Sequence, residues 1–231
     1  MIKTQTKNIK VFATCILVLC LVFFNLSCGL DIIEYYEPPY VTINPPEPEN
    51  IDSNQKYISF STNNSENTSI SFKGTNVFYK IYNNREDARN DRDRLKSISQ
   101  NDYSGTSANK LIDDYKYAML NNSNILCPKP KSGSDDYDVR IDFTDSNKFA
   151  LIINVDGKEE QKPLRAVENK EFNFDSSYWT YENEQRDFDV KYNSSSATDV
   201  WYVQFFAASV GLSSTLTEQY SNIVYLGCIS L

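Results

Sequence analysis

A repeated alternation of apolar and polar residues is the feature that most constrains how this chain can fold. Ile58 and Phe60 alternate with tyrosine and serine, and Val139, Ile141 and Phe143 alternate with charged residues. Because successive side chains of a β-strand point to opposite faces, each run predicts a strand with one buried and one wet face. Further runs of this kind, or short continuous apolar runs, occupy residues 70–72, 77–82, 149–155, 188–192, 201–211 and 223–229. The chain is therefore predicted to be mainly β, with antiparallel sheets.

Turn signals divide and end these runs. Residues 74–76 (Gly-Thr-Asn) are expected to turn the chain between two strands, Asp156-Gly157 is a strong hairpin signal, and Gly211 is expected to end a strand. In the run 188–192, Asp189 falls on the polar face. Its side chain is therefore expected to be wet, and replacing it with alanine is expected to cost little stability.

Two helical runs interrupt the strands and form an insertion around residues 85–120. Asn84 can cap the first run, residues 85–98, whose apolar stripe is thin, so this helix is expected to lie exposed on the surface. The second run, residues 107–120, has an apolar face that needs covering, formed by Leu111, Ile112, Tyr115, Ala118 and Met119. Residues 121–136 are expected to form a loop.

The first 27 residues have the parts of a secretory signal. They contain three lysines and no acidic residue, and residues 11–24 are apolar except for Thr14. A membrane-spanning helix requires about 20 apolar residues, so residues 11–24 are too short to span a bilayer alone. Residues 11–30 would just span if Asn25 and Ser27 were tolerated, which leaves an uncleaved anchor as an alternative.

The residues FNLSCG at the end of the apolar run resemble the lipobox of bacterial lipoproteins. Ser27 precedes Cys28 as the small residue, while Asn25 occupies the usual aliphatic position, a loosening similar to that of spirochaetal lipoproteins. The resemblance implies a signal peptide of residues 1–27, cleavage before Cys28, and lipid on this cysteine, including a fatty acid such as palmitate. It places the chain on a membrane of the cell envelope, at the outer membrane and cell surface or on the periplasmic face. An ordinary signal peptide remains a further alternative.

Residues 28–50 are expected to form a lipidated, proline-rich tether. Pro38-Pro39 and Pro45-Pro46 bracket residues 40–43, and Pro48 follows. Proline cannot donate a hydrogen bond to a sheet, so this stretch is expected to be extended, with at most a short edge strand. The folded domain is then expected to cover residues 51–231.

The charge of the chain is acidic and disfavours nucleic acid as a partner. Removing residues 1–27 takes away three lysines and no acid, so the net charge of −8 becomes −11. Such a surface repels phosphate backbones. The lipobox resemblance implies the membrane as a partner, through lipid on Cys28, and a protein partner is expected as well.

Two of the five cysteines, Cys127 and Cys228, lie outside the signal and the lipobox. One disulfide between them is possible in an oxidising compartment. Two buried free thiols are the alternative.

Several kinds of catalytic chemistry are excluded by composition. The chain has no histidine and only seven glycines, so it lacks the commonest catalytic triads and the glycine-rich phosphate loops. No cofactor and no enzymatic activity are expected. Asp135, Asp136, Asp138 and Asp142 form a cluster that could bind calcium, although a solvated acidic loop with Arg140 inside it is the simpler interpretation.

Tyr178, Trp179 and Tyr181 could form an exposed aromatic patch for sugar or protein binding, although core packing is the simpler interpretation. The loop at residues 212–220 and the loop around Asp156-Gly157 are the other candidate contact sites.

The last two strand runs, 201–211 and 223–229, resemble the final strands of a fibronectin type III domain. In that family an aromatic, a branched and a small residue alternate before a turn, as Trp201, Val203 and Ala207 do here. The resemblance implies an immunoglobulin- or fibronectin-like β-sandwich, in which the helical insertion is foreign. A rigid sandwich that presents loops favours a non-catalytic binding or adhesion role. The alternative is a structural or assembly role in the periplasm.

Overall fold

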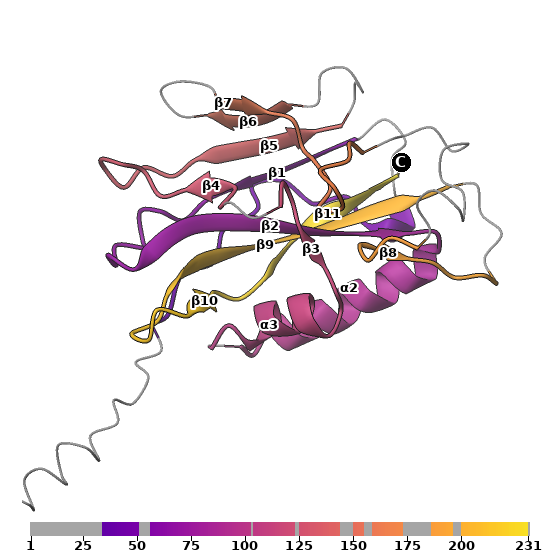
Figure 1. Ribbon diagram of the computed structural model, residues 1–231, viewed down its shortest axis with the longest axis horizontal. Coiled ribbons are helices and arrows are strands. Elements are labelled where there is room, and N and C mark those ends of the chain that lie inside the picture. The colour runs from indigo at the N-terminus through magenta and orange to yellow at the C-terminus, as the bar shows by residue number, and fades with distance from the viewer. Residues whose placement is uncertain are drawn as a thin grey trace, which may run out of the picture. The chain divides into compact units, whose positions relative to one another are not determined.

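Two β-sheets and two α-helices make up the part of the chain that the computed structural model describes (Figure 1). The described residues are 34–50, 56–102, 104–122, 125–143, 150–154, 159–172, 186–195 and 200–230. At the centre, β2 (Phe72–Tyr82) and β9 (Tyr202–Leu212) pair antiparallel along their whole length. Beside β9 lie β10 (Glu218–Tyr220) and β11 (Val224–Ser230), and beside β2 lie β3 (Ala118–Met119), β4 (Cys127–Pro128) and β8 (Val190–Lys191). These seven strands form sheet B, in which only β8 is parallel to its described neighbour.

Sheet A is smaller and antiparallel throughout its described strands. Its strand order is β1 (Tyr57–Ser61), β5 (Asp138–Asp142), β6 (Ala150–Asn154) and β7 (Glu159–Gln161). The antiparallel pairing of β6 with β7, in which Ile153 faces Glu159, agrees with the hairpin predicted from Asp156-Gly157. The two turn residues themselves lie outside the described part of the chain.

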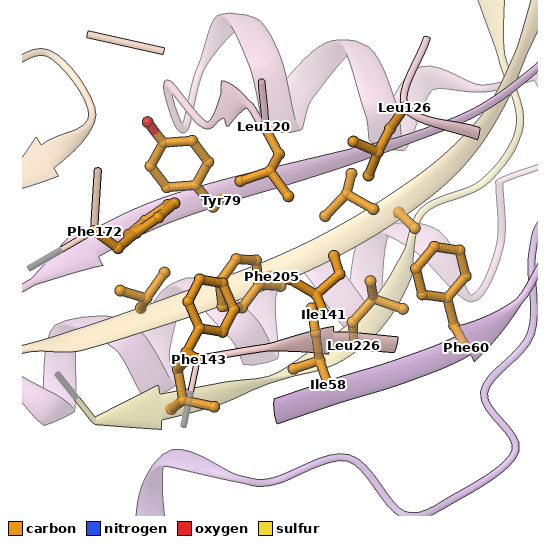
Figure 2. Close-up of a cluster of buried hydrophobic side chains, with 14 of the residues drawn as sticks. Ile58, Phe60, Tyr79, Leu120, Leu126, Ile141, Phe143, Phe172, Phe205 and Leu226 are labelled. Carbon is orange, nitrogen blue, oxygen red and sulfur yellow. The ribbon is translucent and has the colours of Figure 1, made fainter. Parts of the chain in front are cut away.

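A first hydrophobic core joins the two sheets. It takes Ile58 and Phe60 from β1, Ile141 from β5, and Tyr79 and Phe205 from the central strands of sheet B (Figure 2). Each of these side chains is at most 1% exposed. The prediction of a mainly β fold, an antiparallel sandwich with two helices, is therefore confirmed.

A second core covers the opposite face of sheet B. The helices α2 (Arg85–Ser99) and α3 (Thr106–Asp113) place Ala88, Leu95 and Leu111 against Phe78 and Phe206 of the central strands. Sheet B is therefore buried on both faces, between sheet A and the helices (Figure 1). Residues 85–98 were expected to lie exposed on the surface. Charged residues of α2 such as Arg85, Asp93 and Arg94 are indeed exposed, while the thin apolar stripe of Ala88 and Leu95 is buried against sheet B.

Two boundaries differ from the sequence-based expectation. The predicted turn at residues 74–76 lies inside β2, where a bulge between Phe72 and Gly74 lets the strand continue. Gly74 has φ 144°, and a Cβ there would overlap the carbonyl oxygen of Cys127. The glycine therefore lets β4 pair closely with β2, and it does not reverse the chain direction. The predicted helix 107–120 ends at Asp113, and Ala118 and Met119 form β3 beside β2.

The described part of the expected tether, residues 34–50, packs onto the sandwich. Tyr36 is 1% exposed, and its hydroxyl donates to the carbonyl oxygen of Leu212. Tyr40 pairs with Ser61, and the amide of Cys228 donates to the carbonyl oxygen of Pro46. The segment ends in a 3-10 turn, η1 (Pro48–Asn50). These residues belong to the domain, because proline-rich backbone can still bury aromatic side chains and hydrogen-bond a sheet edge.

Candidate binding surface

A buried ion pair lies at the edge of the first core and joins two loops to β2. The Arg165 guanidinium donates to both carboxylate oxygens of Asp189, at 2.9 and 2.6 Å, and to Asp187 at 2.8 Å. Arg165 and Asp189 are both 0% exposed, and the Tyr79 hydroxyl donates to Asp189 at 2.5 Å. Burial and the neighbouring Asp189 carboxylate raise the pKa of Tyr79 well above its usual value. The expectation that Asp189 lies on a wet face was wrong, and these groups serve to hold the loops in place.

A second polar cluster lies beneath α2. The hydroxyl of Tyr82 donates to Asp91 at 3.0 Å and contacts the hydroxyl of Tyr117 at 2.9 Å, and Tyr117 donates to Gln204 at 2.5 Å. The Lys191 ammonium donates to both oxygens of Asp91. Burial raises the pKa of both tyrosines, so they stay protonated and act as hydrogen-bond donors. The cluster fixes the helix on the sheet.

Three of the four acidic residues considered as calcium ligands, Asp136, Asp138 and Asp142, have protein partners for their carboxylates. Asp136 accepts from the amide and hydroxyl of Ser65 at 3.0 Å, and Asp138 accepts from the Ser61 hydroxyl at 2.5 Å. Asp142 pairs with Arg140 at 2.9 Å. Among the described residues, no group of three or more carboxylate or cysteine side chains is placed to hold a metal ion.

Cys127 and Cys228 are free thiols, and both are 0% exposed. Cys127 belongs to the core between the sheets, whereas Cys228 belongs to the core beneath the helices. Sheet B separates them, so the second of the two alternatives, buried free thiols, describes the structure.

Five of the eight large exposed hydrophobic side chains in the described chain lie at the two ends of sheet B, and the other three, Tyr35, Tyr40 and Ile43, lie in the segment 34–50. At the end where β2 finishes, Phe188 is 62% exposed, Val200 is 42% exposed and Tyr192 is 39% exposed. Tyr192 stacks on Trp201, with ring centroids 6.3 Å apart, and Trp201 is itself buried. We call Phe188, Tyr192 and Val200 the distal surface. The run 188–192 was expected to place Phe188 inside, but β8 contains only Val190 and Lys191.

At the other end of sheet B, where β2 begins, Ile70 is 94% exposed and Leu216 is 77% exposed. Ile70 was expected to face the core. The described chain enters at this same end, because the Glu34 amide donates to Gln219 and its carboxylate accepts from Ser69. β2 has eleven residues, so at about 3.3 Å per residue the two ends are about 33 Å apart. Figure 1 shows them as the ends marked by β10 and β8.

Other residues singled out in the sequence lie outside the described part of the chain. These are Cys28 with the whole of residues 1–27, and the aromatic patch of Tyr178, Trp179 and Tyr181. Among the described helices, none is long and apolar enough to cross a bilayer. Comparison with known proteins found no matching family model, no matching curated protein and no matching solved structure.

Proposed function

We propose that this chain is a non-catalytic lipoprotein of the cell envelope, anchored through lipid on Cys28, whose β-sandwich presents a binding surface for a protein partner. The lipobox-like residues before Cys28 support the anchor. The polar clusters support a non-catalytic role, because their buried groups, Asp189 and Asp91 among them, hold loops and helices in place. No cofactor and no nucleic acid enters the proposal.

The observation that carries the binding role is the placement of the distal surface. Phe188 and its neighbours lie at the end of sheet B opposite to the end where Glu34 enters. A chain anchored a few residues before Glu34 would therefore present Phe188 away from the membrane. Exposed aromatic side chains on a rigid frame provide large contact areas at low entropic cost and dominate many protein interfaces.

Charge indicates what kind of protein would bind. After removal of residues 1–27 the net charge is −11, and opposite charges on a partner would accelerate association. A basic partner is therefore expected, and its binding should weaken as salt concentration rises.

The proposal is tested by comparing two exposed positions at opposite ends of the domain. Basic proteins that the intact chain retains from envelope and host extracts are purified, and their affinities are measured for the parent, Phe188→Ser and Ile70→Ser. Phe188→Ser should weaken binding about tenfold or more, as loss of a central aromatic contact does, whereas Ile70→Ser should leave it unchanged. Equal affinities for all three proteins would remove the distal surface from the proposal.

Proteolysis of whole cells separates the binding role from the periplasmic alternative. If the domain is displayed outside the cell, added protease should cleave it while the cells stay intact. Protection until the envelope is opened would favour the structural or assembly role in the periplasm.

A further inference from the structure

Two neighbouring loops each carry a single large aliphatic side chain into solvent. Ile70 and Leu216 are the most exposed of the large hydrophobic residues in the described chain, at 94% and 77%. Their segments, residues 67–72 (NTSISF) and 212–217 (LSSTLT), contain no charged residue, although 23% of the chain is charged. We call these two segments the apolar tips.

The apolar tips lie side by side at one end of sheet B. Phe72 pairs with Gly211, and the Leu212 amide donates to the carbonyl oxygen of Ser71 at 3.1 Å. One end of the sandwich therefore presents isoleucine, leucine and hydroxyl groups together.

The second tip holds Leu216 in a conformation that leucine rarely adopts. Leu216 has φ 62°, in the left-handed region where glycine or asparagine is usual. Ser213 fixes the turn. Its carbonyl oxygen accepts a hydrogen bond from the Leu216 amide, and its own amide donates to the carbonyl oxygen of Thr217. Leucine here is unfavourable for the backbone and leaves its side chain in water, so packing within the described domain does not account for it.

The chain length before Glu34 limits what that contact can be. The Glu34 carboxylate accepts hydrogen bonds from Ser69 and Ser71, the two neighbours of Ile70. Only five residues lie between Cys28 and Glu34, and the six Cα-to-Cα steps that join these two residues span at most about 22 Å even when the chain is fully extended. If Cys28 carries lipid, the apolar tips stay close to the bilayer surface.

The chemistry of the apolar tips suits the boundary between lipid headgroups and acyl chains. Hydroxyl and aliphatic groups enter this layer without the cost of desolvating a charge. Lys73 is exposed beside the first tip, and the Lys129 ammonium donates to the carbonyl oxygen of Ser69 at 2.8 Å. Lysines in such positions place their charge among headgroup phosphates while their stems cover apolar surface. Carboxylates also lie nearby. Those of Glu34 and Glu218 each accept from a tyrosine hydroxyl, and Glu66, directly before the first tip, is exposed.

We infer that the apolar tips dip into the surface of the membrane that holds the Cys28 lipid, with Ile70 and Leu216 in the interfacial layer. This inference rests on the proposed lipid anchor and adds a second contact to it. The two contacts hold β2 and β9 upright, so that the distal surface stands about 33 Å from the membrane.

The test measures the depth of each loop with a fluorophore. Full-length chains with Ile70→Cys, Leu216→Cys or, as the control at the other end, Phe188→Cys are produced with their lipid and labelled with an environment-sensitive dye. Cys127 and Cys228 are buried, and a sample without an added cysteine corrects for their labelling. The proteins are placed in phosphatidylethanolamine and phosphatidylglycerol vesicles, with and without nitroxide-labelled lipid. The mass of each protein is measured to establish whether Cys28 carries lipid.

The dye at residues 70 and 216 should shift its emission to the blue and be quenched several-fold more strongly than the dye at residue 188. Equal, weak quenching at all three sites in lipidated protein would overturn the inference and leave the anchor intact. If the blue shift grows with protein concentration and is not accompanied by quenching, the apolar tips form a contact between two copies of the chain. That result would also overturn the inference. Absence of lipid on Cys28 would overturn the proposed anchor and this inference with it.

Discussion

Tyr36 illustrates how a single residue decides where a segment belongs. Its ring packs beside Phe72, and its hydroxyl contacts Glu34, Ser71 and Leu212. The ring lies directly over Gly211, where a Cβ would overlap it. Gly211 was predicted to end a strand, and β9 does end one residue later, at Leu212; the glycine also provides the space that Tyr36 fills.

Replacement of this glycine is the first prediction. Gly211→Ala should lower the free energy of unfolding by about 1–3 kcal/mol, because the added methyl group displaces the Tyr36 ring. In a Tyr36→Ala background the same replacement should cost almost nothing, since the ring is gone. Urea denaturation of the four proteins gives the coupling. Costs that simply add would show that Tyr36 does not rest on Gly211.

The ion pair of Arg165 and Asp189 provides the second prediction. Asp189→Ala should lower the free energy of unfolding by about 3–5 kcal/mol, because it leaves a buried guanidinium without its carboxylate. Glu86→Ala, which removes the exposed pair with Arg89 on α2, should cost less than about 1 kcal/mol. Chemical denaturation measures both. If both variants lost similarly little unfolding free energy, Asp189 would be solvent-exposed, as the alternation of its strand had predicted.

At the scale of elements, periodicity predicted where strands lie better than it predicted where they end or which strands they pair with. The strands β1 and β5 follow from alternation because one face of each meets the core between the sheets, whereas β9 is a largely apolar run because both of its faces are buried. The continuity of β2 through Gly74 and the end of α3 at Asp113 could not be predicted, since both depend on pairing with distant strands. The same holds for the exposure of Ile70 and Phe188, which have an apolar pattern but lie beyond the ends of strands.

The carboxylate of Asp102, four residues before α3, accepts from the Ser107 amide in the first turn of the helix, and its titration should be visible in stability. Burial of Asp102 would raise its pKa, but hydrogen bonds from Ser107 and Ser104 outweigh burial and lower it below the usual 3.8. A depressed folded-state pKa contributes stability above the ordinary value, and this contribution is lost as pH falls through the folded-state pKa. Asp102→Asn should therefore flatten the decline in unfolding free energy at acid pH. A parallel decline in both proteins would contradict this assignment.

The placement of the two thiols on opposite faces of sheet B gives a further prediction. Burial raises the pKa of Cys127 to about 12 and also raises that of Cys228, so few thiolates exist near neutral pH. Both thiols should react slowly with iodoacetamide in the native protein and quickly after unfolding without reductant, as followed by mass spectrometry. If neither reacts after unfolding, they are disulfide-bonded and the described arrangement of sheet B is wrong.

For the whole molecule, the sequence predicted the class of fold but not its third layer or its full extent. Helices on the far face of sheet B and the packing of residues 34–50 both depend on apolar surface that becomes available only after the strands assemble. The distal surface and the first tip were missed because Phe188 and Ile70 lie beyond the ends of strands, whereas the second tip lies in the loop 212–220, which the sequence did indicate as a candidate contact site. The distal surface and the apolar tips lie at opposite ends of β2 and β9. This arrangement orients the domain on a membrane only if the chain is anchored at Cys28.

Fatty-acid labelling of Cys28 tests this central claim most directly. Cells that express the full chain are grown with radioactive palmitate, and the parent is compared with Cys28→Ala. The parent should incorporate label and lose residues 1–27, whereas Cys28→Ala should remain unlabelled and full-length, because lipid attachment to the thiol precedes cleavage. Equal labelling of the two proteins, or no labelling of the parent, would contradict the account.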